Sequence, residues 1–412
     1  MKVSIITPTH DARFLVECYK SLRRQTIKDW EWIVVLNGKA KVEDVPDDPR
    51  VRVVRFPGRV MGVGHIKGFA FRQAKGDILL ELDHDDLLTP DALAETIAAF
   101  ADPEIGFVYS DWADFADDGR PVTYRRADTR PNWDACGWKF YDLKGIECVR
   151  AWEPSAAALS LVFYAPNHLR AWRRSVYEAA GGHSANLEVA DDHDLLVRTF
   201  LLSRMRHIPK CLYLYRVHKT NTWSPRTGSI TSLTNAIRDR WLADLVLREC
   251  ELDAVPCYDL GGAMNCPEGW TPVDVKQSKD GQPTVVADLR EPWPFPDGSV
   301  GAFRAVDFLE HIADKRFVMS EIHRCLRPNG WLLSQTPSTD GRGAWQDPTH
   351  VSFWNENAFW YWTRSSHAGY IENDDIRFIE QRLFTSSGDI PYVVADLQAL
   401  KPGAPRQPGR IL

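Results

Sequence analysis

An acidic cluster follows an apolar run in the first quarter of the chain. Residues 77–82 read DILLEL, and the next four residues are Asp83, His84, Asp85 and Asp86. Carboxylates this close repel one another and need a cation nearby, and hard oxygen ligands suit Mg²⁺ or Mn²⁺, which also bridge phosphate groups. A helix N-cap is the alternative, because a Thr-Pro pair and an amphipathic segment follow, but capping accounts for one acidic residue and not for three. The cluster therefore predicts a divalent-metal site.

A second acidic cluster precedes an apolar segment of helical spacing near the middle of the chain. It reads ADDHD and contains Asp191, Asp192 and Asp194. Acidic residues at the N-terminus of a helix are stabilised by the helix dipole, so an ordinary helix start explains them. Neighbouring acids also raise one another's pKa, which suits a general base. Both interpretations stay open on the residues alone.

The elements that must position these clusters alternate between strand and helix patterns. The expected strands are residues 2–8, 30–36, 51–56 and 77–82, and the expected helices are residues 12–25 and 63–74. This alternation predicts βαβ units and a parallel sheet, in which ligands bind at the carboxyl ends of the strands. The candidates for binding are therefore the polar residues after the strands: Thr9, His10 and Asp11; Asn37, Gly38 and Lys39; and residues 83–86.

The second half of the chain starts a new α/β pattern. Its expected strands are residues 253–260, 271–275, 284–287 and 330–335, its expected helix is 317–325, and the first strand ends in Gly261-Gly262. We therefore expect a first domain at residues 1–226, a helical connector at 227–251, a second domain at 252–395 and a flexible Pro/Gly/Arg-rich tail at 396–412.

Residues 1–225 resemble the family 2 glycosyltransferases of GT-A fold. The resemblance rests on the segments VSIITPTHDA, AKGDILLELDHDDLLTPDAL, GGHSANLEVADDHDLLVRTF and YRVHKTNT. It implies an α/β domain with a Rossmann-like mixed sheet and a metal-dependent, inverting transfer of a sugar. The donor implied is a nucleoside-diphosphate sugar, with a UDP-sugar favoured, and the acceptor is a hydroxyl group. A polysaccharide, a lipid-linked glycan, a protein and a nucleic acid base all stay open as acceptors.

The same resemblance implies roles for the first acidic cluster. Asp85 is the direct ligand of Mn²⁺ or Mg²⁺, with Asp86 as the alternative, and Asp83 lies near the ribose and the metal. His218 either completes the metal site or is structural. The donor-binding residues implied are Pro8, Thr9, His10, Asn37, Lys67, Asp83 and His84.

Three further expectations concern single positions. Lys67 either neutralises a phosphate group or faces solvent. Asn37 stands where many family members carry a pair of Asp residues, and its amide both donates and accepts, so the nucleotide stays open. Of the second acidic cluster, the resemblance implies Asp192 as the base that deprotonates the acceptor, with Asp191 as the alternative.

Residues 252–360 resemble the class I S-adenosylmethionine-dependent methyltransferases. The resemblance rests on YDLGGAMNCPEGWTPVDV, VVADLREPWPFPDGSVGAFRAVDFLEHI and EIHRCLRPNGWLLSQTP. Ala263 replaces a usual Gly, and the stretch between Gly262 and Asp274 is short. We therefore expect the first helix to be reduced or absent and S-adenosylmethionine to bind weakly. The cofactor-binding residues implied are Gly261, Gly262, Asp274, Asp288, Leu289 and Asp307.

The function of this second domain stays open at this stage. Asp347 and His350 lie among aromatic residues and indicate either an acceptor pocket or a capping loop. The domain either methylates the same glycan or only binds an acceptor or partner. Two alternatives remain for the whole chain. Methyl transfer to a glycan or nucleobase is the main activity, with the first domain as a binding module, or the protein is a non-catalytic glycan-binding scaffold.

Composition limits the classes of protein further. The formal net charge is −6 and 44% of the residues are hydrophobic, which excludes a disordered chain and lacks the basic footprint of a nucleic-acid binder. No apolar run approaches the ~18 residues of a membrane span, and the N-terminus reads as a strand and not as a signal peptide. The eight cysteines form no CxxC pair. These features predict a cytoplasmic protein.

Overall fold

The computed structural model describes residues 1–123, 137–218, 223–279, 281–373, 375–405 and 407–408. The chain divides into two compact units, Met1–Leu245 and Val246–Leu412. Helix α7 (Trp223–Leu252) carries the chain from one unit into the other. The domain boundaries expected at residues 226 and 252 stay predictions.

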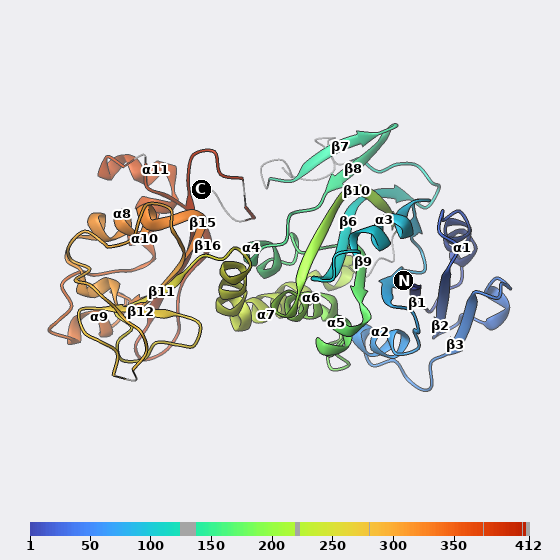
Figure 1. The fold of residues 1–412 in the computed structure, drawn as a ribbon, viewed down its shortest axis with the longest axis horizontal. Helices are drawn as coiled ribbons and strands as arrows, with labels where there is room; N and C mark the ends of the chain where they lie inside the picture. Colours follow the sequence, from blue (N-terminus) through green and yellow to red (C-terminus); the bar gives the residue numbers. More distant parts are fainter. Residues whose placement is uncertain (124–136, 219–222, 280, 374, 406, 409–412) are drawn as a thin grey trace. The chain divides into compact units, whose positions relative to one another are not determined.

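The first unit is built on a ten-stranded mixed sheet (Figure 1). Its longest path runs in the order β3-β2-β1-β4-β9-β6-β10-β5, and β7 and β8 extend it beside β6. The first four of these strands are parallel, whereas β9 is antiparallel to both neighbours. The strands are β1 (Val3–Thr9), β2 (Trp30–Leu36), β3 (Val51–Arg55), β4 (Ile78–Glu81), β5 (Leu87–Leu88), β6 (Ile105–Ala116), β7 (Lys139–Leu143), β8 (Ile146–Arg150), β9 (His168–Arg173) and β10 (Arg204–Val217).

Short helices pack on this sheet. In α1, Leu15, Cys18 and Leu22 are buried at helical spacing, which is the amphipathic pattern that predicted the helix. Helix α6 packs against both α2 and α5 (Figure 1). The helices are α1 (Leu15–Arg23), η1 (Val42–Asp44), α2 (Val63–Phe71), α3 (Ala92–Ala99), α4 (Ala156–Ser160), α5 (Arg174–Ala179) and α6 (Asp191–Leu202).

Tryptophans anchor the core of the first unit. Trp32 on β2 is fully buried, and its indole N–H donates to the Thr7 hydroxyl on β1 at 2.9 Å. Trp172 on β9 is also fully buried and donates to Thr199 on α6 at 3.2 Å. A buried indole needs such a partner. These bonds hold β1 beside β2, and α6 against the sheet, which fixes the elements that carry the polar clusters.

A buried histidine links β10 to β6. His207 Nε2 lies 2.6 Å from Asp111 Oδ1, and its Nδ1 lies 2.9 Å from Glu153 Oε1. Burial alone lowers the pKa of His207, but the two carboxylates outweigh it and raise the pKa to about 8. The protonated imidazole is therefore the form that the fold stabilises.

We expect this histidine to make stability depend on pH. A folded pKa above the unfolded value gives stability that is complete below pH ~6.5 and is lost as pH rises through about 8. His207→Gln should therefore lower the melting temperature most at about pH 6, and the deficit should shrink by about pH 9. Melting curves of both proteins across this range are the measurement, and a deficit independent of pH would contradict the assignment.

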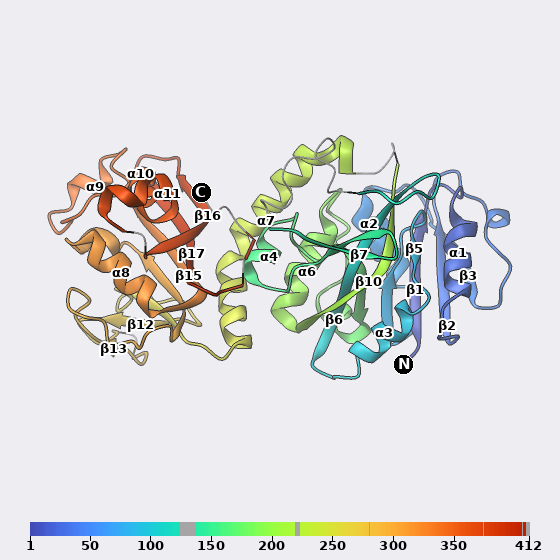
Figure 2. The ribbon, with the colours of Figure 1, turned by 90° about the horizontal axis from the view of Figure 1, so that it is seen from above.

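The second unit has a seven-stranded sheet in the order β13-β12-β11-β14-β15-β17-β16. The first five strands in this order are parallel, and β17 runs antiparallel to both of its neighbours, β15 and β16. Strands β15, β16 and β17 lie side by side (Figure 2). The strands are β11 (Cys257–Leu260), β12 (Thr271–Asp274), β13 (Val285–Val286), β14 (Val300–Val306), β15 (Leu326–Pro337), β16 (Arg377–Thr385) and β17 (Tyr392–Leu400).

The helices of this unit confirm one expectation about its first crossover. Residues 261–270, which join β11 to β12, contain no helix and form turns, so the first helix is absent, as the short Pro- and Gly-containing stretch predicted. The helices that do form are η2 (Leu309–His311), α8 (Lys315–Cys325), α9 (Gly343–Gln346), α10 (Glu356–Thr363), α11 (Ser365–Ala368) and η3 (Gly369–Ile371).

The flexible tail was predicted to start at residue 396, which is too early in the chain. Residues 396–400 belong to β17, which pairs with β15 on one side and with β16 on the other. The alternation of Val393, Ala395, Leu397 and Ala399 buries one face of this strand in the core. The Pro/Gly composition that suggested a tail starts only at residue 401, and residues 406 and 409–412 lie outside the described residues.

Among the helices of the described residues, none combines the length and the apolar character that crossing a membrane requires.

Candidate active site

The carboxyl ends of β1, β2 and β4 meet at one edge of the first sheet. Thr9 pairs with Leu36, and Ile6 pairs with Glu81, in parallel register. The residues that follow each strand are therefore neighbours: the Asn37 backbone N–H donates to the Thr9 carbonyl at 2.8 Å, and the Lys39 N–H donates to the His10 carbonyl at 3.3 Å. The structure thus brings together strand-end residues that the sequence selected separately.

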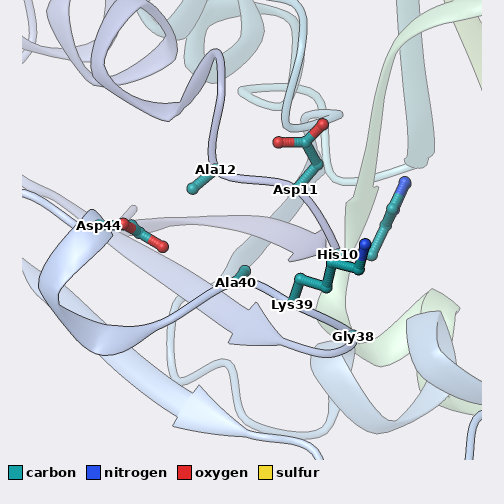
Figure 3. Close-up of a pocket in the computed structure, with 7 residues that line it drawn as sticks. All are labelled: His10, Asp11, Ala12, Gly38, Lys39, Ala40 and Asp44. Carbon is teal, nitrogen blue, oxygen red and sulfur yellow. The ribbon is translucent and has the colours of Figure 1, made fainter.

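A pocket of about 480 Å³ opens between these strand-end turns (Figure 3). In Figure 3 the side chains of His10 and Lys39 lie together, and Asp44 lies at the opposite side. Gly38 has a φ of +64°, and a Cβ there would lie 3.1 Å from the Cβ of His10, so the turn needs glycine. The pocket is lined by His10, Asp11, Ala12, Gly38, Lys39, Ala40 and Asp44.

Only some of the residues predicted to bind the donor line this pocket. His10 lines it, and the His84 ring stacks edge-on against His10 with centroids 5.0 Å apart. Pro8 and Thr9 end β1 just below it, and Thr9 is buried with its hydroxyl donating to the Asp11 carbonyl at 2.5 Å. Asn37 lies beside the pocket and not in its lining. Lys39 lines the pocket although it was selected only for its place after β2.

The first acidic cluster forms a turn after β4 in which the carboxylates have different partners. Asp85 Oδ2 lies 2.7 Å from His218 Nε2, from the loop after β10. Asp86 is buried, and both of its oxygens accept hydrogen bonds, from the Arg216 N–H at 2.7 Å and the Tyr213 hydroxyl at 2.8 Å. Asp86 is thus occupied in holding β10, whereas Asp85 has solvent contact, which supports Asp85 over Asp86 as the metal ligand.

The remaining carboxylate of the cluster is Asp83. Burial raises its pKa, and the nearby charges of Glu81 and Asp85 raise it further against the opposing effect of Lys67. A cation beside Asp83 would relieve this cost. Asp83 does not complete a compact group with Asp85 and His218: in the part of the chain that the structure describes, three ligand atoms within 4.8 Å of one another occur only in the second unit.

The donor set of Asp85, His218 and Asp83 nevertheless fits Mn²⁺ or Mg²⁺. These ions bind proteins through one or two carboxylates and take their remaining ligands from water and substrate phosphates. Asp85 and His218 already face each other at 2.7 Å, and two protein ligands meet that requirement.

The second acidic cluster begins α6, and its two leading residues differ in exposure. The Asp191 side chain is 3% exposed and lies 2.7 Å from His183 Nδ1, whereas the Asp192 side chain is 37% exposed. The preceding residue, Ala190, has a φ of +59°, a left-handed conformation that costs energy in a residue with a Cβ. Only Asp192 of this pair is open to an acceptor.

A buried ion-pair network connects Asp192 to the strand before the first cluster. Arg170 on β9 donates to Asp192 Oδ2 at 2.6 Å and to Glu81 Oε1 at 3.0 Å. Lys67 on α2 pairs with the same Glu81 oxygen and is buried. The expectation that Lys67 might face solvent is therefore wrong, and its charge neutralises Glu81, which leaves phosphate binding by Lys67 a prediction.

Sequence reasoning missed Glu81, Arg170 and His183. A signal for Glu81 existed, because a single charged residue inside the apolar run DILLEL requires a buried partner. Nothing local to Arg170 or His183 marked them, since their partners lie at least eight residues away along the chain.

The network lowers the pKa of Asp192, whereas the neighbouring acids had been expected to raise it. Burial raises the pKa of Asp192, but the charges of Arg170 and Lys67 outweigh burial and lower it. Neighbouring acids do not dominate here, because the guanidinium lies in direct contact with the carboxylate. Asp192 is therefore ionised at neutral pH, as a base must be, but the same charges make it a weaker proton acceptor.

The second unit places its Gly turn beside Asp274. Gly261 follows β11 with a φ of +75°, and the Ala263 N–H donates to Asp274 Oδ2 at 3.4 Å. A Cβ on Gly262 would lie 2.7 Å from Asp259 Oδ2, so the fold itself requires glycine there. Asp274 thus lies at the carboxyl edge beside an open turn, where a carboxylate fits a ribose.

The other three residues predicted to bind the cofactor lie in different environments. Asp288 is held by the Arg290 guanidinium at 2.6 Å, and Leu289 is buried in the hydrophobic core. Asp307 follows β14 with a φ of +50°, next to Phe308, whose ring a Cβ on Gly261 would meet at 3.2 Å. The structure therefore brings Gly261, Asp274 and Asp307 to one edge, whereas the Leu289 side chain belongs to the core.

The first unit, a mixed sheet with an acidic cluster at its carboxyl edge, has the GT-A type of fold, and the second unit, five parallel strands followed by the antiparallel β17 and then β16, resembles the methyltransferase type. Residues 4–148 match the family model of Glycosyl transferase family 2, and residues 271–334 match the model of a Methyltransferase domain. Both matches confirm the resemblances predicted from the sequence.

Curated relatives match just over half of the chain. The O-antigen biosynthesis protein RfbC of Myxococcus xanthus is 28% identical over 57% of this chain and 17% of its own length. The chondroitin synthase of Escherichia coli is 24% identical over 53% of this chain and 29% of its own length. The chain therefore spans less than a third of either relative.

Two solved structures align with 61% of the chain. S. aureus TarS residues 1–349, in complex with UDP-GlcNAc, are 17% identical with a TM-score of 0.42, and the alignment covers 73% of that chain. The mannosyltransferase PcManGT of Pyrobaculum calidifontis, in complex with GDP-Man and Mn²⁺, is 19% identical with a TM-score of 0.39 over 75% of that chain.

Proposed function

We propose that the first unit is a metal-dependent, inverting glycosyltransferase that uses a nucleoside-diphosphate sugar. The observation that carries the proposal is the ion-pair network around Arg170 and Glu81. It ties Asp192, the partly exposed acid at the start of α6, to β4, the strand that precedes the acidic cluster of Asp85. A base and a metal ligand are thereby held in fixed relation, and the family 2 match of residues 4–148 supports this assignment.

The reaction is a single displacement. Asp192 accepts the proton of the acceptor hydroxyl, whose oxygen bonds to the anomeric carbon while the bond from that carbon to the diphosphate oxygen breaks. Arg170 keeps Asp192 ionised before the step and holds its carboxylate through the bond at 2.6 Å. Asp85 and His218, with Asp83 beside them, would hold the divalent ion, whose positive charge would stabilise a departing diphosphate.

The donor and acceptor follow from the pocket and the relatives. The pocket beside β1 and β2 suits the nucleoside, and Lys39 and His10 supply donors for its polar groups. A UDP-sugar is the favoured donor by resemblance to the family. Relatives named for O-antigen biosynthesis and for chondroitin synthesis support a glycan acceptor.

The test is a screen of UDP-, GDP- and TDP-sugars against the full chain, with and without Mn²⁺. A ligand that binds only the native state raises the melting temperature, so one nucleotide class should give a shift that requires the metal, and the same donors should release nucleoside diphosphate on incubation. Equal, metal-independent shifts with every donor and no release would contradict the proposal.

For the second unit we propose weak binding of S-adenosylmethionine. Gly261 and Asp274 at the carboxyl edge support it, and the absence of a helix at residues 261–270 removes the N–H groups that a helix N-terminus would present. Whether this unit methylates the glycan product depends on that binding.

We expect Asp274→Ala to remove this binding without changing sugar transfer. The two oxygens of Asp274 are the groups best placed to accept from ribose hydroxyls, and within the described part of the chain they accept only long bonds of 3.2 and 3.4 Å from backbone N–H groups. Calorimetric titration of the full chain is the measurement, with the exposed Asp297→Ala as the control. No heat from the unaltered chain at millimolar cofactor would contradict the proposal.

A further inference from the structure

A group of three side chains in the second unit converges on one point. Glu310 and His311 belong to η2, just after β14, and His350 lies in the loop between α9 and α10. One ligand atom from each of the three lies within 4.8 Å of the others. Their separation of about forty residues along the chain hides this group from sequence patterns.

Glu310 has an unsatisfied oxygen that faces this group. The residue is 2% exposed, and its Oε2 accepts from the Thr336 hydroxyl, whereas Oε1 has no hydrogen-bond partner among the residues that the structure describes. The His350 Nε2 lies 4.0 Å from that Oε1. A buried carboxylate oxygen without a donor is costly, and a cation between Oε1 and the imidazole would remove this cost.

Both imidazoles are oriented for metal binding by backbone carbonyls. His350 Nδ1 lies 3.0 Å from the Ala344 carbonyl oxygen, and His311 Nδ1 lies 3.2 Å from the Thr349 carbonyl oxygen. A carbonyl oxygen only accepts, so each Nδ1 carries the proton and each Nε2 keeps its lone pair. This is how outer partners fix metal-binding histidines in proteins.

The loop that carries His350 is itself fixed. The N–H groups of Val351 and Ser352 donate to the Glu310 carbonyl at 2.9 and 3.0 Å. Asp347 Oδ1 accepts from the Thr349 N–H and hydroxyl, and its Oδ2 lies 4.0 Å from His350 Nε2. The geometry is therefore held by bonds outside the group, with a further carboxylate within reach.

We propose that Glu310, His311 and His350 bind a divalent transition-metal ion such as Zn²⁺. Two imidazole nitrogens and one carboxylate oxygen are a common ligand set for Zn²⁺. Bonds of ~2.0–2.2 Å place two tetrahedral ligands ~3.3–3.5 Å apart, so the 4.0 Å between His350 Nε2 and Glu310 Oε1 needs to contract by only about half an ångström. The fourth position is open to Asp347, water or a substrate.

The site lies at the carboxyl end of β14, beside Asp307. It is separate from the metal site proposed in the first unit, which uses Asp85 and His218. It does not depend on sugar transfer, and it lies partly outside residues 271–334, since His350 follows the segment matched by the methyltransferase model.

The test uses the full chain carrying Asp85→Ala, so that the first unit contributes little metal binding. After treatment with a chelator, titration with Zn²⁺ should show one ion per chain. His311→Ala with His350→Ala should weaken binding by more than ~100-fold, since even outer partners of a metal ligand contribute 10–100-fold. His367→Ala, a histidine of the same unit on α11, is the matched control and should keep the ion.

A spectrum distinguishes this site from adventitious surface binding. Loading Co²⁺ in place of Zn²⁺ should give a visible absorption of a nitrogen-and-oxygen site, which Glu310→Gln weakens and the double histidine variant removes. Glu310→Gln keeps the side-chain size, and circular dichroism shows that each variant is folded. Absence of bound Zn²⁺, or unchanged binding and spectrum in the folded histidine variant, would overturn the proposal.

Discussion

Asp192→Asn should lower turnover by at least ~100-fold while the donor Kd changes little, the signature of losing a general base. Asparagine keeps the size of the side chain and still accepts a hydrogen bond from Arg170, which now lies 2.6 Å from the carboxylate. The amide does not accept the acceptor proton. Single-turnover rates and donor titrations on the same preparations separate the two quantities.

The matched control is Asp194→Asn on the same helix turn. Asp194 pairs with Arg198 at 2.6 Å and its side chain is 19% exposed, about half as much as that of Asp192, so its substitution should leave turnover near that of the unaltered chain. A collapse of donor affinity in Asp192→Asn would instead place Asp192 in the donor site and contradict its assignment as the base.

The same carboxylate also predicts the acid limit of activity. Because Arg170 and Lys67 lower the pKa of Asp192 against the effect of burial, the residue stays deprotonated until the pH falls below the ordinary aspartate value of ~3.9. Protonation of Asp192 should therefore not reduce turnover between about pH 5 and about pH 7.

Asp85→Ala should abolish the Mn²⁺-dependent stabilisation by a nucleoside diphosphate and reduce turnover by ~10²–10³-fold, since a bound ion contributes several kcal/mol to charge stabilisation. The fold should persist, because the polar contacts of the Asp85 side chain within the described residues are with His218 and His84. Thermal shifts with UDP and Mn²⁺, with and without the substitution, are the measurement.

Comparing Asp85→Ala with Asp86→Asn tests which of the two residues is the metal ligand. Both Asp86 oxygens accept hydrogen bonds inside the protein, and an amide replaces one acceptor by a donor, so this variant should lose about 1–3 kcal/mol of stability. It should keep the Mn²⁺ effect at temperatures where it is folded. If Asp86→Asn abolishes the metal effect and Asp85→Ala does not, the ligand assignment is reversed.

Much of the fold was predictable because its signals are local. The run WEWIVVL predicted β2 to the residue, and the apolar positions of residues 12–25 predicted α1 with ends longer by a few residues. Helix ends were less certain, since they depend on hydrogen bonds to other segments. The tail was misplaced for the same reason: residues 396–400 have little strand signal apart from alternation, and only pairing with β15 and β16 makes them a strand.

The sequence by itself determined that acidic clusters follow β4 and begin α6, because strand and helix periods place residues 83–86 and 191–194 at those ends. Tertiary structure alone decided which of these carboxylates keep contact with solvent. Asp86 is occupied by Tyr213 and Arg216, and Asp191 by His183. The group of Glu310, His311 and His350 also exists only in three dimensions. The physical reason is that charge, burial and hydrogen bonding depend on partners that lie as far as 133 residues away, whereas the periodicity that forms a strand or helix extends over only a few residues.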